Sequence, residues 1–311
     1  MKLKDFINSG EIDFSEQIFL NKFETLFSNL SNNDNIIYYT ANHHKTTNDL
    51  IKIFEKVSYH NNNTKLLMIN PDIDFPFIKQ SIINTIENVS YNNDTQSFWE
   101  KQNIDYFLDD KIISLIPKNL EIFCNSNLIE HKNVTMIPLG RDFKGMNFVK
   151  NFSNKKITKD ILCYLNFSTP PFFWHWYGRI RQYISDFADK NDWILKENTI
   201  PNNNREINNN FLNYYNKLSR SKFMIAPRGC GLDTYRLWDS IYLGCIPIVV
   251  NYSNNTGYNQ FKDLPIYFID SWEDYLNLTP EKLNQVWDTM INTEYNYEKL
   301  KFSYWENLIK K

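Results

Sequence analysis

Short apolar runs alternate with amphipathic stretches along most of the chain. In the first half, the runs that predict strands are NIIYYT, TKLLMIN, EIFCNS and VTMIPL, at residues 35–40, 64–70, 121–126 and 134–139. Helices are predicted between them, around residues 15–29, 46–58 and 76–89. The first half is therefore predicted to alternate strands with helices.

The alternation is cleaner in the second half. Strands are predicted at residues 160–167, 192–197, 222–226, 246–250 and 264–270, with helices near 175–188, 208–219 and 233–243. The run IPIVV is apolar without alternation, as expected for a strand that is buried on both faces. Strands separated by helices of this length imply right-handed crossovers and a parallel sheet. The predicted fold class is therefore α/β.

The domain boundaries follow from the polar segment and the tail. Residues 140–158 lack strong periodicity and are interpreted as a linker between two α/β halves. In the tail, Ser271 with Asp274 forms a capping box, and Thr279-Pro280 is a typical helix start. We expect an N-terminal domain at 1–145, a second domain at 155–285, and a C-terminal helix within 286–311 that packs back on the first.

Composition narrows the class of protein. With 311 residues, 42% of them hydrophobic, the chain is long enough for two domains with a core. The net charge of -2 gives no basic field that would attract nucleic acid or an anionic membrane. Four cysteines without a CxxC pattern suggest packed, reduced thiols. With no signal peptide and no long apolar stretch, the expected location is cytoplasmic.

Glycine points to the region where ligands bind. The chain has only 8 glycines, and all but one lie between Gly140 and Gly257. A chain this poor in glycine is expected to use it where the backbone requires it.

Residues 221–250 contain the densest candidate chemistry. A predicted strand ends at Ala226, and the turn PRGCGLD leads into a helix with Asp233 as its expected N-cap. Gly244 suits the left-handed position that follows the helix. The loop would lie at the carboxyl end of a parallel strand, where open α/β sheets bind ligands, and the helix N-terminus suits a phosphate.

Three charged residues in this segment allow two interpretations. Arg228 and Arg236 could supply bidentate positive charge to a phosphate, and Asp239 could accept two hydrogen bonds from a ribose diol. Arg236 and Asp239 could equally form an ordinary ion pair on a helix surface. The loop GCGLD also departs from GxGxxG, so the pattern alone leaves both interpretations open.

The segment resembles the C-terminal signature of exostosin-like glycosyltransferases, the glycosyltransferase family 47 type. That signature has a PRG loop, then R-L-W-[DE]-x-x-x-x-G-x-I-P-[IV]-V, a DLP-containing strand and an S-W-[DE] element. The matching positions here are Pro227, Arg228, Gly229, Gly231, Arg236, Leu237, Trp238, Asp239, Gly244, Ile246, Pro247, Ile248, Val249, Asp263, Leu264, Pro265, Ser271, Trp272 and Glu273. The match covers about residues 214–275 and weakens toward 120.

The resemblance implies the GT-B architecture, in which two Rossmann-like domains face each other across a cleft. It implies transfer from a UDP-sugar to a hydroxyl of a glycan acceptor, with inversion and without a metal. Arg228 and Arg236 then look like diphosphate contacts, Gly229 and Gly231 shape the nucleotide loop, and Asp239 looks like the ribose-binding acid. The implied partners are the nucleotide sugar and the acceptor, with no cofactor besides the donor.

A second loop follows the first strand of the second half. The segment LCYLNFSTPPFFWHWYGRIRQYI places Ser168 and Thr169 beyond the strand, then Gly178, Arg179 and Arg181 at the start of a helix. In GT-B enzymes the corresponding loop faces the cleft. Arg179 or Arg181 could therefore stabilise the charge of the leaving diphosphate in place of a divalent metal. The aromatic rings at 172–177 could stack on the base or the sugar, but we expect most of them to form a hydrophobic plug or lid.

An inverting transfer also needs a base that takes the proton of the acceptor hydroxyl. The candidates follow predicted strand ends in the first half. His43 and His44 follow one strand, and Asp142, next to Arg141, follows another. Asp72 ranks after these three.

Three other functions compete with this hypothesis. Asp72-Ile73-Asp74 is a DxD, the metal-binding pattern of the GT-A transferases, although the pattern is short and common. A non-catalytic module that binds nucleotide sugar or glycan would keep Arg228, Arg236 and Asp239 and lack the base. A dinucleotide-dependent dehydrogenase is disfavoured because its GxGxxG is missing.

Overall fold

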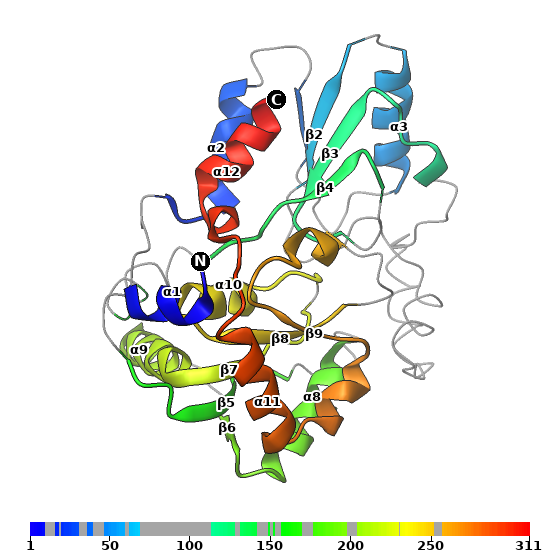
Figure 1. The fold of residues 1–311 in the computed structure, drawn as a ribbon. Helices are drawn as coiled ribbons and strands as arrows, with labels where there is room; N and C mark the ends of the chain where they lie inside the picture. Colours follow the sequence, from blue (N-terminus) through cyan, green and yellow to red (C-terminus); the bar gives the residue numbers. More distant parts are fainter. Residues whose placement is uncertain are drawn as a thin grey trace.

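Two parallel β-sheets, one in each half of the chain, organise the protein (Figure 1). The structure is a computed structural model. It describes residues 1–9, 16–18, 20–30, 36–39, 47–59, 62–68, 113–127, 131–141, 149, 152, 157–169, 177–197, 204–229, 231–251 and 257–311.

The first sheet contains β1 (Ile36–Tyr39), β2 (Thr64–Met68), β3 (Leu120–Cys124) and β4 (Val134–Met136), paired in this order and all parallel. Helices α2 (Leu20–Leu30) and α3 (Thr47–Ser58) belong to the same half. These elements confirm the predicted strands to within a few residues. The helix expected at 76–89 lies outside the described residues.

The second sheet contains β5 (Ile161–Leu165), β6 (Ile194–Lys196), β7 (Ser221–Ile225), β8 (Ile246–Val250) and β9 (Tyr267–Ile269). Its order is β6-β5-β7-β8-β9, with every pair parallel. Numbered within this sheet, the order is 2-1-3-4-5, which is a doubly wound arrangement. The chain reverses its direction across the sheet between β5 and β7, so their carboxyl ends form the topological switch point. The α/β class is thus confirmed.

The helices of the second half cover both faces of this sheet. Helix α9 (Asn204–Arg220) contacts α10 (Tyr235–Tyr242) through a hydrogen bond from Tyr215 to Asp239. Helix α8 (Tyr177–Asp189) instead contacts the short helix η4 (Trp272–Asn277), where Tyr183 stacks on Trp272. This grouping agrees with right-handed crossovers, which place α8 on the opposite face from α9 and α10.

Helix ends in the second half follow the local sequence. Thr279 Oγ1 accepts the N–H of Lys282 at 3.2 Å and begins α11 (Pro280–Met290), as predicted. The Asp274 carboxylate accepts the N–H of Ser271 at 2.9 Å, which confirms the capping box. Gly244 has φ of +62° after α10, and the N–H groups of residues 244 and 245 close a Schellman motif.

One cap differs from the prediction. The N-cap of α10 is Thr234 and not Asp233, and the helix begins at Tyr235. The Asp233 carboxylate accepts the N–H of Thr234 at 2.8 Å, but it also accepts the N–H of Leu139 at 2.8 Å. Local spacing could not show this second bond, because Leu139 is 94 residues away.

Helix α1 (Leu3–Ser9), which the sequence analysis did not predict, packs on the second half. The N–H of Lys4 donates to Ile291 O at 3.1 Å, and Phe6 stacks on Tyr297 with centroids 4.1 Å apart. At the other end of the chain, η5 (Tyr297–Leu300) is followed by α12 (Phe302–Lys310), which packs against α2 (Figure 1). The first helix of the chain thus packs on the second half, and the last helix packs on the first half.

The described chain therefore passes between the halves three times, at residues 16–18, 139–141 and 300–302, which together we call the junction. Tyr242 of α10 binds two of these passages: its hydroxyl accepts the N–H of Ile18 at 3.2 Å and donates to Leu300 O at 2.7 Å. The N–H of Arg141 donates to Ile18 O at 3.1 Å. Gly140 is required here, because its φ is +72° and a Cβ would lie 2.3 Å from Ile18 O.

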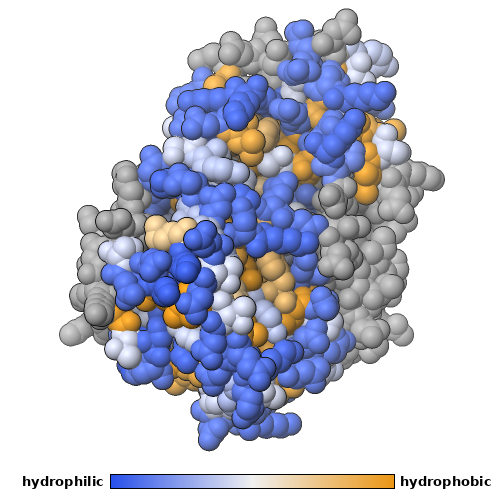
Figure 2. Space-filling model, in the orientation of Figure 1, coloured by the Kyte–Doolittle hydropathy of each residue, from blue (hydrophilic) through white to orange (hydrophobic). Residues whose placement is uncertain are grey.

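Charged and polar side chains cover most of the surface seen in Figure 2, and apolar residues appear there only in small groups. The second sheet is the centre of a large buried cluster that extends to α1, α2 and α12. Cys124, Cys163 and Cys245 are buried thiols. Among the described helices, none is long and apolar enough to cross a membrane.

We expect Tyr242→Phe to lower the free energy of unfolding by about 1–3 kcal/mol, because it leaves two buried backbone groups without a partner. Urea denaturation measures the change. Tyr59→Phe is the matched control, since Tyr59 is 87% exposed. Equal stabilities for the two variants would show that the hydroxyl of Tyr242 does not hold the junction.

Candidate nucleotide-binding site

Three of the predicted arginines meet at the switch point of the second sheet. Arg181 comes from α8, Arg228 from the loop after β7, and Arg236 from the first turn of α10. The loops that follow β5 and β7 supply the backbone carbonyl groups that these arginines contact. This edge is where doubly wound sheets bind their ligands.

Arg181 connects the two loops. Its Nε donates to Arg228 O at 3.1 Å, and its Nη1 donates to Ser168 O at 3.2 Å. The guanidinium also lies over the ring of Phe167, 5.3 Å from the centroid. A buried guanidinium between two strand ends fixes their spacing and places positive charge at the switch point.

The glycine loop allows Arg181 to come this close. A Cβ on Gly229 would lie 3.2 Å from the terminal nitrogen of Arg181, tighter than ordinary packing. The N–H of Gly229 donates to Gly231 O at 3.1 Å, which closes the loop on itself. Arg228 is 7% exposed, so its charge is also buried. The predicted role of Gly229 and Gly231 in shaping a nucleotide loop stays a prediction.

Arg236 completes the group. Its Nε donates to the backbone carbonyl of Asn166, the first residue after β5. Because Arg236 is half-buried and lies in the first turn of α10, its charge adds to the positive end of the helix dipole. Arginines from three elements thus lie at one edge of the sheet, and guanidinium groups can form paired hydrogen bonds with phosphate oxygens.

Several predicted residues cannot be placed. Arg179 lies within α8, but its side chain is outside the described part. Asp142, His43, His44, Asp72 and Asp74 also fall outside it, as do residues 170–176. Their predicted roles stay predictions. Within the described ranges, no group of three or more His, Cys, Asp or Glu side chains could hold a metal ion.

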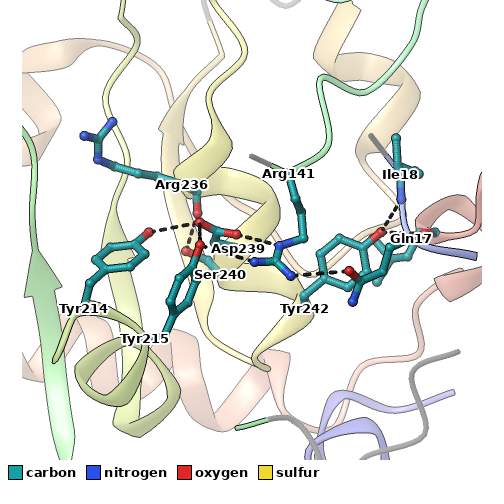
Figure 3. Close-up of polar contacts among 10 residues, drawn as sticks. Gln17, Ile18, Arg141, Tyr214, Tyr215, Arg236, Asp239, Ser240 and Tyr242 are labelled. Atoms are coloured by element: carbon teal, nitrogen blue, oxygen red, sulfur yellow. Dashed lines mark hydrogen bonds and ion pairs between the residues drawn. The ribbon is translucent and has the colours of Figure 1, made fainter. Parts of the chain in front are cut away.

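Asp239 lies at the centre of the network in Figure 3, and it is not on an exposed helix face. It is 3% exposed, and its Oδ1 accepts the Nε of Arg141 at 2.7 Å. The guanidinium of Arg236 points away from it in Figure 3. The alternative of an exposed Arg236–Asp239 pair is therefore wrong, because the carboxylate faces the junction.

Tyrosines from α9 satisfy the other oxygen of Asp239. Tyr215 donates to Oδ2 at 3.1 Å, and Tyr214 is 3.5 Å from the same atom. Burial, and then the nearby charge of Asp239, raises the pKa of both tyrosines. They therefore keep their protons and act as donors. The predicted ribose contact of Asp239 stays a prediction, with both of its oxygens already engaged inside the protein.

The guanidinium of Arg141 is enclosed by hydrogen-bond acceptors at its nitrogens and by aromatic rings. Its terminal nitrogens lie 3.4 Å from Gln17 Oε1 and 3.3 Å from the hydroxyl of Tyr215. Its plane lies between the rings of Tyr215 and Tyr242, at 5.5 and 5.7 Å from the centroids. Burial lowers the pKa of Arg141, but the charge and hydrogen bond of Asp239 more than offset this and raise it overall. Arg141 therefore stays protonated, and its contact with Asp239 joins the junction to α10.

Asp233 forms a second buried link between the halves. Besides the N–H groups of Leu139 and Thr234, its carboxylate accepts the Nε1 of Trp238 at 2.9 Å, and its own N–H donates to Ser126 Oγ at 3.2 Å. Burial raises the pKa of Asp233 to about 7, although these hydrogen bonds act to lower it.

Sequence reasoning missed the role of Arg141, which it noted only as the neighbour of a candidate base. It also missed Tyr214, Tyr215 and Glu197, which surround the site. Their partners are more than ten residues away in the chain, so no local spacing indicates them. The sequence indicated Arg141 and Glu197 only through their position at or just after the end of a predicted strand.

Comparison with known proteins adds no family. No protein-family model matches the sequence, and no curated protein matches it either. The site is a cluster of arginines at the switch point of a doubly wound sheet.

Arg141→Met should lower the free energy of unfolding by about 3–5 kcal/mol, because Asp239 then stays buried without its cation. The double variant Arg141→Met/Asp239→Leu should recover part of this loss. Urea denaturation of the four proteins of the cycle measures the coupling. Arg220→Met, which breaks the exposed pair with Asp160, is the control and should cost far less. Strictly additive losses would contradict a coupled pair.

The raised pKa of Asp233 predicts a pH dependence. Between about pH 4 and 7 the folded protein holds a proton on Asp233 that the unfolded chain has released, so stability should fall as the pH rises. Asp233→Asn removes the titrating carboxyl group. The slope of the free energy of unfolding against pH in this window should then become less negative than in the wild type. Urea midpoints from pH 4 to 8 test this, and identical slopes would contradict it.

Proposed function

We propose that the protein is a glycosyltransferase of exostosin-like type, which moves a sugar from a UDP-sugar to a hydroxyl of a glycan acceptor with inversion. The observation that carries the proposal is the convergence of Arg181, Arg228 and Arg236 at the switch point between β5 and β7. The residues around this loop are the same ones that resemble the transferase signature.

The arginines suit the chemistry of the leaving group. When the bond from the sugar to the diphosphate breaks, negative charge grows on the diphosphate oxygens. Guanidinium groups held in place by backbone carbonyls stabilise that charge without reorganising. In the proposed mechanism these arginines stabilise the charge of the leaving diphosphate, as a divalent metal does in GT-A enzymes. Arg179, at the start of α8, would add a further positive charge.

The first half is proposed to hold the acceptor, in the GT-B manner. The base that takes the acceptor proton is then Asp142, His43 or His44, which follow β4 and β1. Inversion requires this base on the face of the sugar opposite the diphosphate. A junction that connects the halves through Arg141 and Asp239 would set the distance between the base and the donor.

Nucleotide binding is the first test. UDP should raise the melting temperature of the wild type by mass action, and Arg236→Ala should abolish the rise. Arg220→Ala is the matched control, because Arg220 ends α9 at the opposite, amino edge of the sheet and pairs with Asp160. A rise with GDP or NAD and none with UDP would overturn the proposal.

Turnover separates the transferase from its competitors. We expect release of UDP from a UDP-sugar, accelerated by a glycan acceptor and insensitive to EDTA. Saturable UDP binding without turnover on any acceptor would instead identify a binding module. Complete loss of activity in EDTA that Mn²⁺ restores would favour the DxD-dependent alternative.

A further inference from the structure

Glu197 is the first residue after β6, so it lies at the carboxyl edge of the second sheet. Its N–H donates to Leu165 O of β5 at 2.9 Å, which continues the pairing of the two strands by one residue. β5 is the neighbour of β6 and borders the switch point. The backbone of Glu197 is thus held rigidly on the edge where the three arginines meet.

Two neutral donors orient the carboxylate of Glu197. The hydroxyl of Tyr164 donates to Oε2 at 2.8 Å, and the side-chain amide of Asn213 lies 3.0 and 3.1 Å from the two oxygens. Burial, and then the carboxylate itself, raises the pKa of Tyr164, so the hydroxyl stays protonated. Strand β5 and helix α9 therefore both fix the direction of this acid.

Polar contacts join Glu197 to the arginine cluster. The hydroxyl of Tyr164 accepts the Nδ2 of Asn166 at 2.9 Å, and the carbonyl of Asn166 accepts the Nε of Arg236. A chain of hydrogen bonds through Tyr164 and Asn166 thus connects Glu197 to Arg236. Both residues lie at the carboxyl edge of the sheet, so one elongated ligand could contact both.

The chemistry of Glu197 suits hydroxyl donors. Within the described residues, no basic side chain lies within ion-pair distance of Glu197, and its described partners are neutral donors. A carboxylate only accepts hydrogen bonds and can take about four, of which the neighbours supply a part. The vicinal diol of a ribose offers two O–H donors. In dinucleotide-binding sheets, an acid near the end of the second strand takes this role, and β6 is the second strand here.

Asp239 is the other acid near the arginines, and its surroundings differ. Its two oxygens face Arg141 and Tyr215, and it is 3% exposed. Glu197 is half-buried, so a ligand can approach it from solvent. Glu197 is therefore the more accessible of the two carboxylates to a nucleotide.

We propose that Glu197 recognises the ribose diol of the nucleotide whose diphosphate contacts Arg181, Arg228 and Arg236. This assignment rests on the proposed function, because it requires that a nucleotide binds at this edge. It adds a residue outside the transferase-like signature and gives the ribose contact to the end of β6 instead of to α10.

Calorimetry with UDP and with 2′-deoxy-UDP and 3′-deoxy-UDP tests the assignment directly. The wild type should bind UDP about tenfold or more tightly than at least one deoxy analogue. Glu197→Gln should bind UDP as weakly as that analogue, and its affinity for the analogue should not change. Tyr164→Phe, which removes the donor that orients Glu197, should lose part of the discrimination. Asp160→Asn, at the amino edge of the same sheet, is the control and should keep the wild-type affinities.

Each outcome has one meaning. If the wild type discriminates and only Asp239→Asn abolishes the discrimination, Asp239 is the ribose contact, and the inference about Glu197 is overturned while the proposed function stands. If the wild type binds UDP and both deoxy analogues equally, no carboxylate recognises the diol, and the inference also fails. If the wild type binds no UDP, the proposed function fails and the inference with it.

Discussion

The buried ion pair between Arg141 and Asp239 is the interaction on which the rest of the structure depends. Two charges out of water are costly unless each is paired and hydrogen-bonded, and here Gln17 and Tyr215 complete the set. Because the pair joins a chain passage between the halves to α10, the same helix that carries Arg236 is tied to the junction. The relative placement of the two sheets and the position of the arginine are therefore coupled.

The candidate site follows from topology as much as from residue type. In a sheet of order 2-1-3-4-5, the loops after the first and third strands diverge, and this is the edge where doubly wound sheets commonly bind their ligands. Arg181 and Arg236 hold the backbone of these loops, while Gly229 lets the backbone come close to Arg181. The glycines at 140, 229 and 244 thus lie where another residue would be strained. Gly140 and Gly244 have positive φ angles, and a Cβ on Gly229 would crowd Arg181.

Three acids near the site show how environment separates residues of one type. Asp239 faces a guanidinium, Asp233 is buried among neutral donors that include a backbone N–H of the other half, and Glu197 stays within reach of solvent. The sequence analysis could single out Asp239 because it lies in a dense local pattern. It treated Asp233 as a simple cap and did not consider Glu197, because their partners are distant along the chain.

By itself, the sequence determined the described strands, most helices, the Thr279 cap and the left-handed Gly244, since each depends on neighbours within a few residues. It also indicated the two loops after β5 and β7 and the arginines in or beyond them, Arg181, Arg228 and Arg236. Only the tertiary structure decided the strand order, the packing of α1 on the second half and the partner of Asp239. These features depend on contacts between residues that are far apart in the chain, 98 residues in the case of Arg141 and Asp239. No local periodicity encodes which distant side chain completes a buried charge.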